Sequence, residues 1–262
     1  MKHTNFKRIL SMLLLMAMLV CMLAGCVTEE DDSDISRRRS RKSQKETEPS
    51  ETEPVPEEPE APILDPQEIY LGNIITFGTF EQDNNLANGA EPIQWQVAQV
   101  QNGRAMLVSR YVLDSRAYHS VDTDITWDQS TIRKWLNGEF LSSAFTEDEQ
   151  MLIAETTNSG GGHPDFTTYA GPSTTDRIFL LSYAEVLQYF PTEAARQCAP
   201  TQYAVIRGVD VSDGCSWWWL RSPGRYQYFA LGVRSNGELF NSGDKISYTD
   251  GGIRPVMWVV LG

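Results

Sequence analysis

The sequence predicts a mixed α+β fold, with short antiparallel strands and a few helices in a single loop-rich domain over residues 67–262. Three observations predict it. Alternating apolar residues flank Asn-Gly pairs, which is typical of β-hairpins. Two short runs are apolar throughout, as in strands buried on both faces. Helix-start signals are few, and long polar stretches separate them. With 196 residues, this segment is long enough to bury one core.

The first predicted hairpin has its turn at Asn102-Gly103, because both residues of such a turn need positive φ. A two-residue loop would pair Val97 with Val108 and Gln99 with Met106. One face of the hairpin is then apolar, and its members are Ile93, Trp95, Val97, Met106 and Val108.

A second hairpin is predicted around Asn236-Gly237, between the alternating segment 229–233 and Phe240. The two continuous apolar runs are Trp217–Leu220 and Val256–Leu261, and both are expected to be buried strands.

Three helices are predicted. The first carries Ile132, Trp135 and Leu136 on one stripe and ends at the C-cap pair Asn137-Gly138. The other two begin at capping boxes. These boxes are Thr146 with Glu149, and Ser182 with Glu185, the latter opening a helix through Tyr189.

The N-terminus has the pattern of a secretory signal over residues 1–25. Met1–Arg8 is positively charged, and Ile9–Met22 is an apolar core too short for a typical spanning helix. Leu23-Ala24-Gly25-Cys26 resembles the lipobox of bacterial lipoproteins. The resemblance implies cleavage before Cys26 and a diacyl lipid on its sulfur, since two acyl chains suffice for a stable membrane anchor. The alternatives are an ordinary signal peptide or an uncleaved anchor.

Residues 26–66 are predicted to be a disordered tether behind the lipidated Cys26. From residue 27 to 66 they include six of the thirteen prolines, thirteen acidic and six basic residues, and no aromatic residue. Such a composition cannot bury enough apolar surface to offset its ordering entropy. The basic block Arg37–Lys42 either contacts anionic lipid or wall polymer, or balances charge within the tether, and we favour the second interpretation.

Charge excludes one class of partner. The chain has a net charge of -13, and residues 67–262 alone combine thirteen basic with twenty-two acidic residues. Nucleic acid is therefore not an expected partner, because binding its phosphates requires a basic patch. The expected partners are the membrane, through the lipid anchor, and a surface protein or glycan. The domain is then expected on the extracellular side of the cell membrane.

The sequence carries few signals for catalysis or metal binding. The sequence has no G-x-S-x-G and no H-E-x-x-H motif, and His163 sits in a glycine-rich segment expected to be an exposed loop. Asp122, Asp124 and Asp128 begin with the spacing of a calcium loop, but Arg133 occupies the place of its bidentate glutamate. We therefore predict no catalytic residue, no metal site and no cofactor.

Six sets of residues along the domain form a recognisable series. They are Trp127–Ser130, Ile132–Asn137, Ile178–Ser182 with Glu185, Pro200-Thr201 with Tyr203-Ala204, Trp218–Gly224 and Gly252–Val256. Together they resemble the bacterial domain-of-unknown-function family 6273, and the resemblance extends over nearly all of residues 67–262. It implies a fold similar to C-type lectins, in the variant of formylglycine-generating enzymes, and it implies no established activity.

Cys198 and Cys215 are expected to form a disulfide, because an isolated cysteine pair outside the cell is normally oxidised. Two alternatives remain: free thiols, or a copper-binding thiol pair as in formylglycine-generating enzymes. The spacing of the two cysteines departs from that of those enzymes.

Ligand-binding residues are expected on the loops of residues 209–251. Trp217, Trp218 and Trp219 are expected to be core, while Arg221 and Arg254 are expected to hold loop carbonyls or a carboxylate such as Asp250. Tyrosine and arginine suit exposed binding surfaces, since they combine contact area with polar groups. The candidates are Arg225, Tyr226, Tyr228, Asp244 and Tyr248. The function predicted is a non-catalytic surface binding module, with a secreted enzyme or a structural envelope protein as alternatives.

Overall fold

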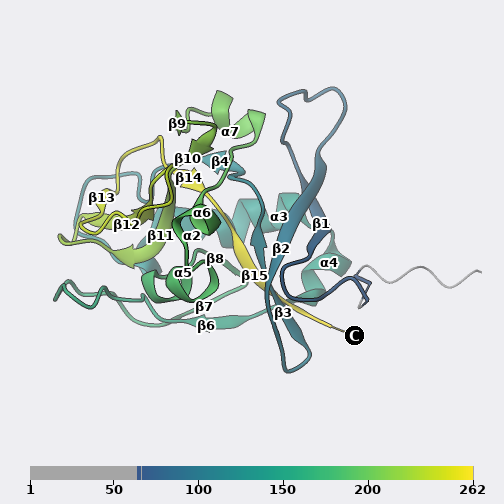
Figure 1. The fold of residues 1–262 in the computed structure, drawn as a ribbon, viewed down its shortest axis with the longest axis horizontal. Coiled ribbons are helices and arrows are strands. Elements are labelled where there is room, and N and C mark those ends of the chain that lie inside the picture. Colours follow the sequence, from purple (N-terminus) through teal and green to yellow (C-terminus); the bar gives the residue numbers. More distant parts are fainter. Residues whose placement is uncertain (1–63, 66, 262) are drawn as a thin grey trace, which may run out of the picture. The chain divides into compact units, whose positions relative to one another are not determined.

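The computed structural model describes residues 64–65 and 67–261 (Figure 1). The predicted signal, the lipidated Cys26 and nearly all of the predicted tether lie outside these residues and stay predictions. No helix within the described part of the chain is both long and apolar enough to span a bilayer.

The first sheet has six strands, in the order β1-β2-β3-β15-β5, with β8 also pairing with β15. All its pairings are antiparallel. β1, β2 and β3 lie in the right-hand half of Figure 1, and β15 crosses its centre toward the C-terminus. The strands are β1 (Ile74–Phe80), β2 (Glu91–Gln101), β3 (Arg104–Ser109), β5 (Ile153–Ala154), β8 (Ile178–Phe179) and β15 (Val256–Val260).

The hairpin of β2 and β3 confirms the predicted turn, since Asn102 and Gly103 have φ of 50° and 68°. Gln99 pairs with Met106 as expected, but a register shift then places Val97 opposite Leu107, and the predicted pairing of Val97 with Val108 is wrong. The cause is an irregularity at Ala98, because one extra residue in a strand offsets every later pair. The predicted apolar face is nevertheless buried: Ile93, Trp95, Val97, Met106 and Val108.

The second sheet has five strands, in the order β13-β12-β11-β14-β4. β11 and β14 are parallel, and the other pairs are antiparallel. Every residue of β11 is buried, as its apolar run predicted. β14 and β15 are consecutive in the chain, so the C-terminal segment supplies one strand to each large sheet. The strands are β4 (Asp114–Ser115), β11 (Trp218–Pro223), β12 (Phe229–Val233), β13 (Asp244–Lys245) and β14 (Gly252–Ile253).

The second predicted hairpin is present only as a short turn. Val233 forms a single bridge to Leu239, and the Gly237 amide donates to the Arg234 carbonyl. Gly237 has a φ of +85°, but Asn236 does not have the positive φ that a two-residue turn would require. β12 instead pairs with β11 and β13.

Two small sheets complete the strands. β6 (Thr156–Asn158) pairs with β7 (Thr174–Asp176), and β9 (Val211–Ser212) pairs with β10 (Cys215–Ser216).

The first predicted helix is longer than expected. The 3-10 turn η1 (Trp127–Gln129) precedes α2 (Thr131–Trp135), which continues through the π-helical turn η2 (Leu136–Phe140) into α3 (Leu141–Ala144).

The prediction that this helix ends at Asn137-Gly138 is wrong. The Asn137 side chain does not cap the helix; its Oδ1 accepts from the amides of Arg177 and Ile178, and its Nδ2 donates to the Ile178 carbonyl. Asn137 thereby fastens the helix to β8.

Both predicted capping boxes are confirmed. Thr146 and Glu149 open α4 (Glu147–Leu152), while Ser182 and Glu185 open α5 (Tyr183–Tyr189). Two further short helices, α6 (Glu193–Arg196) and α7 (Gln202–Ile206), begin at threonine N-caps. These short helices and the mainly antiparallel strands confirm the α+β class.

Candidate ligand-binding site

A cavity of about 670 Å³ lies where α6 meets the β6–β7, β11–β12 and β12–β13 connections. Its volume lies within the ~300–1,000 Å³ typical of small-ligand sites. The lining is mostly charged or polar, and only Phe166 and Leu239 are apolar. The lining residues are Phe166, Glu193, Arg196, Arg225, Arg234, Glu238, Leu239, Asn241 and Ser242.

Arg196 is the buried cation of this cavity, with 6% of its surface exposed. Its Nε donates to the Gly237 carbonyl at 2.7 Å, and its Nη1 donates to the Phe190 carbonyl at 3.0 Å. Its Nη2 has no hydrogen-bond partner among the described residues. This nitrogen is also not one of the fully buried polar atoms that lack a partner there, so it remains accessible. The two carbonyl bonds fix the guanidinium plane, so Nη2 is a preorganised donor at the cavity.

The turn of residues 234–238 forms one wall and is locked to α6. Besides the Arg196 bond, Gln197 Nε2 donates to the Asn236 carbonyl at 3.1 Å. A Cβ added at Gly237 would lie 2.0 Å from the Glu193 carbonyl oxygen, so only glycine permits this approach. The Arg234 guanidinium lies 4.1 Å over the Phe240 ring.

The three arginines of the cavity lack ionic partners. Within residues 64–65 and 67–261, no carboxylate oxygen lies within 4.0 Å of Arg196, Arg225 or Arg234. Glu193 and Glu238 also line the cavity. The lining therefore has one more positive than negative charge.

A smaller cavity, of about 360 Å³, shares Arg234 and Glu238 with the first. Its lining includes the aromatic side chains of Trp217 and Phe240, whose rings meet edge to face at 5.8 Å. The turn of residues 234–238 thus borders both cavities.

Another cavity, of about 390 Å³, has arginines that are already neutralised. Arg116 and Arg207 line it, and both pair with the fully buried Asp114, at 2.7 and 3.2 Å. The unpaired arginines therefore distinguish the 670 Å³ cavity from this one.

The structure brings four of the five predicted ligand residues to one end of β12 and β13. Arg225 lines the cavity. The exposed rings of Tyr226 and Tyr228 stack with centroids 5.7 Å apart. Asp244 pairs with Ala230 in the strand register.

Tyr248, the fifth candidate, is exposed, and its amide donates to the Lys245 carbonyl just beyond β13. None of the four residues Tyr226, Tyr228, Asp244 and Tyr248 lines a cavity described above. The roles proposed for all five residues stay predictions.

Sequence reasoning missed Arg196, Glu193, Arg234 and Glu238. Arg234 and Glu238 bracket the predicted Asn236-Gly237 turn, which was a usable signal, because residues flanking a tight turn lie close together. Nothing in the sequence marks Arg196 as buried, since α6 is only four residues long.

The expectation that His163 is exposed is wrong. Only 7% of its surface is exposed, and its ring lies 4.4 Å from that of Phe166 and 4.3 Å from that of Tyr183. Its Nδ1 accepts from the Asp165 amide at 3.1 Å, while the buried Nε2 has no partner among the described residues. His163 is therefore a buried residue that packs against Phe166, one of the residues lining the 670 Å³ cavity.

Both cysteines carry free thiols in the structure. Their segments are adjacent, because the Ser216 amide donates to the Cys198 carbonyl at 2.9 Å. Cys198 is buried, which raises the pKa of its thiol. The Cys198–Cys215 disulfide stays a prediction.

The buried arginines hold loops in place, as expected. Arg221 donates to the carbonyls of Ser159 and Leu180. It also forms an ion pair with Glu185, so its carboxylate partner is Glu185 and not Asp250, which was given as an example. Arg254 donates to the Ser109 carbonyl, and its guanidinium lies 4.6 Å over the Phe190 ring. The three predicted core tryptophans, Trp217, Trp218 and Trp219, are all buried.

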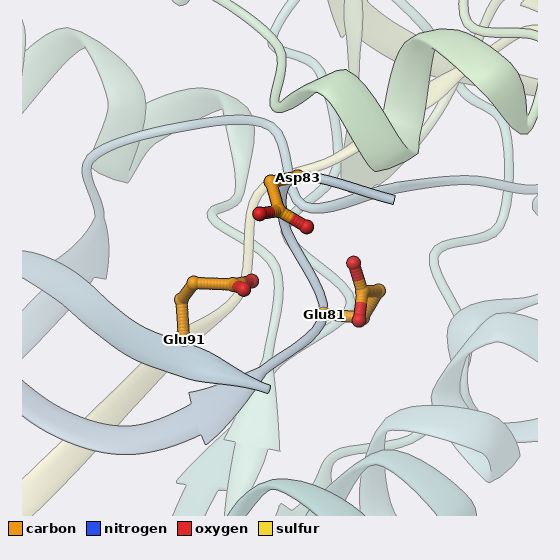
Figure 2. A group of neighbouring side chains, drawn as sticks. All are labelled: Glu81, Asp83 and Glu91. Carbon is orange, nitrogen blue, oxygen red and sulfur yellow. The ribbon is translucent and has the colours of Figure 1, made fainter. Parts of the chain in front are cut away.

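An acidic group that sequence reasoning did not single out lies beside the β1–β2 loop. Glu81, Asp83 and Glu91 bring one carboxylate oxygen each to within 4.8 Å of one another (Figure 2). Their oxygens already accept from nearby amides, including Gln82 and Asn85. Hydrogen bonds to Asn88 and Asn85 lower the pKa of Asp83. These carboxylates therefore already have hydrogen-bond partners within their own loop.

Comparison with known proteins identifies a matching protein family. The profile of the family described as "Domain of unknown function (DUF6273)" matches residues 102–261. The match begins in the turn between β2 and β3, so it covers less than the predicted 67–262 and leaves out β1 and β2. No curated protein and no solved structure gives a significant match. The chain belongs to the DUF6273 family.

Proposed function

We propose that residues 67–262 form a non-catalytic binding module, held on the extracellular side of the cell membrane by a lipid on Cys26. The loops of residues 209–251 hold the ligand, a surface protein or a glycan. The observation that supports this proposal is the 670 Å³ polar cavity, because Arg225 and the β12–β13 connection belong to those loops. Rigid strands carry loops in this way in many binding domains.

The main alternative is an enzyme that uses Cys198 and Cys215, as formylglycine-generating enzymes use a thiol pair. The environment of Cys198 disfavours it, since only 2% of the residue is exposed and its Sγ donates to the Arg110 carbonyl. A reactive thiol needs an accessible site and a lowered pKa, whereas burial raises the pKa of Cys198. A structural envelope protein is the third possibility, and it would need no cavity.

The finer fold assignment is part of this proposal. A C-type-lectin-like arrangement would place irregular loops above a small twisted sheet. The second sheet is compatible with such an arrangement, because the candidate ligand residues lie in the loops next to its strands β12 and β13.

Cys26→Ser tests the anchor. The substitution is expected to leave the precursor unprocessed or to release the protein from the membrane fraction, because it removes the sulfur that would carry the diacyl lipid. Immunoblots of fractionated cells measure both effects, and Cys215→Ser serves as the control. Normal processing and membrane retention of Cys26→Ser would contradict the proposed anchor.

The triple variant Tyr226→Ala, Tyr228→Ala and Tyr248→Ala tests ligand capture. It is expected to abolish capture while unfolding stays normal, since exposed substitutions typically change stability within ~0.5 kcal/mol each. Capture from a glycan array and from extracts of surface proteins, by the full-length chain in detergent, is the measurement. Tyr70→Ala, also at an exposed tyrosine, is the control. Capture that survives the triple variant would contradict a role for these tyrosines.

A further inference from the structure

We propose that the 670 Å³ cavity binds the carboxylate of an acidic sugar, with Arg196 Nη2 as the fixed donor and with Arg225 and Arg234 completing the anion site. This inference rests on the proposed binding function and names its ligand class.

The arginines indicate an anion. Only 6% of the Arg196 surface is exposed, and two backbone carbonyls hold its guanidinium group. The group therefore has a fixed orientation at the cavity. A buried guanidinium without an ionic partner gains from a ligand carboxylate, because charge-assisted hydrogen bonds are roughly twice as strong as neutral ones. Arg225 and Arg234 are exposed, carry no ion pair and line the same cavity.

The two glutamates limit the charge of that anion. With Glu193 and Glu238 beside three arginines, the lining has a net charge of one positive unit. A single carboxylate would neutralise it, whereas a doubly charged phosphate would leave an excess of negative charge near both glutamates. The cavity therefore favours a monoanion.

The remaining lining favours a sugar as the carrier. The glutamate carboxylates, Asn241 and Ser242 can accept or donate hydrogen bonds to hydroxyl groups, while Phe166 and Leu239 supply the only apolar surface. An apolar peptide side chain would gain little in such a cavity. The adjoining 360 Å³ cavity, with Trp217 and Phe240, could receive the next sugar ring beyond the Arg234–Glu238 wall.

The test uses four ligands that differ only at carbon 6 of one sugar: glucuronate, its methyl ester, glucose and glucose 6-phosphate. Galacturonate and its methyl ester repeat the comparison for the other C4 configuration. Binding to the full-length chain in detergent is measured by saturation-transfer NMR and calorimetric titration. We expect at least one uronate to bind at least about tenfold more tightly than its ester, glucose or the sugar phosphate.

Variants locate the site. Because Arg196→Gln removes bonds that hold α6 to the turn, it is expected to affect folding, so the deciding variant is Arg225→Gln with Arg234→Gln. Both residues are exposed, and their loss should weaken uronate binding at least about tenfold. Thermal unfolding should change only slightly, through the lost contact of Arg234 with the Phe240 ring. Arg104→Gln with Arg110→Gln, at two exposed arginines in and just after β3 of the other large sheet, removes the same two positive charges and should leave binding unchanged.

Equal binding of uronate and ester, tighter binding of the phosphate, or uronate binding that survives Arg225→Gln with Arg234→Gln would each overturn the inference. If no sugar binds while tyrosine-dependent capture of another ligand persists, the inference fails and the binding function stands. If neither uronate binding nor any capture is found, both fail.

Discussion

Glu185→Gln is expected to destabilise the domain by about 3 kcal/mol. The Arg221 side chain is only 2% exposed, and its one carboxylate partner within the described part of the chain is Glu185. Removing one member of a buried pair typically costs ~3–5 kcal/mol, because the other charge stays buried without compensation. We expect the lower end of that range, since 27% of the Glu185 side chain is exposed and glutamine can still accept one hydrogen bond.

Chemical denaturation measures this loss, and Glu149→Gln is the matched control. Glu149 also occupies the third position of a capping box, but it has no arginine partner among the described residues. The control should cost well under half as much. Equal losses in the two variants would mean that the capping box, and not the ion pair, stabilises the fold.

The same pair predicts a pH dependence. Burial raises the pKa of Glu185, but hydrogen bonds and charge attraction from Arg221, together with the Ser182 bonds, outweigh it, so the folded pKa lies below the ordinary 4.5. A depressed folded pKa contributes stability that is complete above the unfolded pKa and is lost as the pH falls through the folded value. Unfolding free energy should therefore fall below about pH 4.5, and less steeply in Glu185→Gln than in the unmodified chain.

Gly237→Ala is expected to destabilise the domain by about 2–5 kcal/mol and to weaken ligand binding at the 670 Å³ cavity. The added methyl group meets the Glu193 carbonyl carbon and oxygen, which are backbone atoms and cannot move aside as a flexible side chain would. Overpacking typically costs ~1–3 kcal/mol, and a φ of +85° adds ~1–2 kcal/mol for a residue with a Cβ. The turn must then move away from α6 and from Arg196.

Gly89→Ala separates these two contributions. Gly89 has a φ of +84°, but a Cβ added there would meet nothing within 4 Å. This control should carry only the backbone cost, ~1–2 kcal/mol, and leave binding unchanged. Denaturation midpoints and uronate titration measure both variants. A Gly237→Ala protein as stable as Gly89→Ala would show that the turn can leave α6 without cost.

The sequence alone determined the features that depend on neighbouring residues. The α+β class, the Asn102-Gly103 turn and the two capping boxes are local, because each needs only residues within a few positions of one another. The predicted apolar run Trp217–Leu220 is likewise buried, since an uninterrupted apolar run already indicates that both faces leave water. The prediction for Val256–Leu261 is right only in part, because Val260 is exposed and Trp258 is half-buried.

Only the tertiary structure decided the features made by distant segments. Asn137 continues a helix instead of ending it, because Arg177 and Ile178, about forty residues later, offer its side chain three backbone partners. The buried state of His163 likewise depends on Tyr183 from α5.

The candidate site belongs to this second group. Arg196 became a preorganised donor because a carbonyl 41 positions away accepts its Nε bond, and the cavity collects arginines from three separate segments. Local sequence patterns carry no information about contacts between distant segments, since the packing of the whole core brings those segments together. The sequence could therefore point to the loops of residues 209–251, but the charge and shape of the cavity came from the fold.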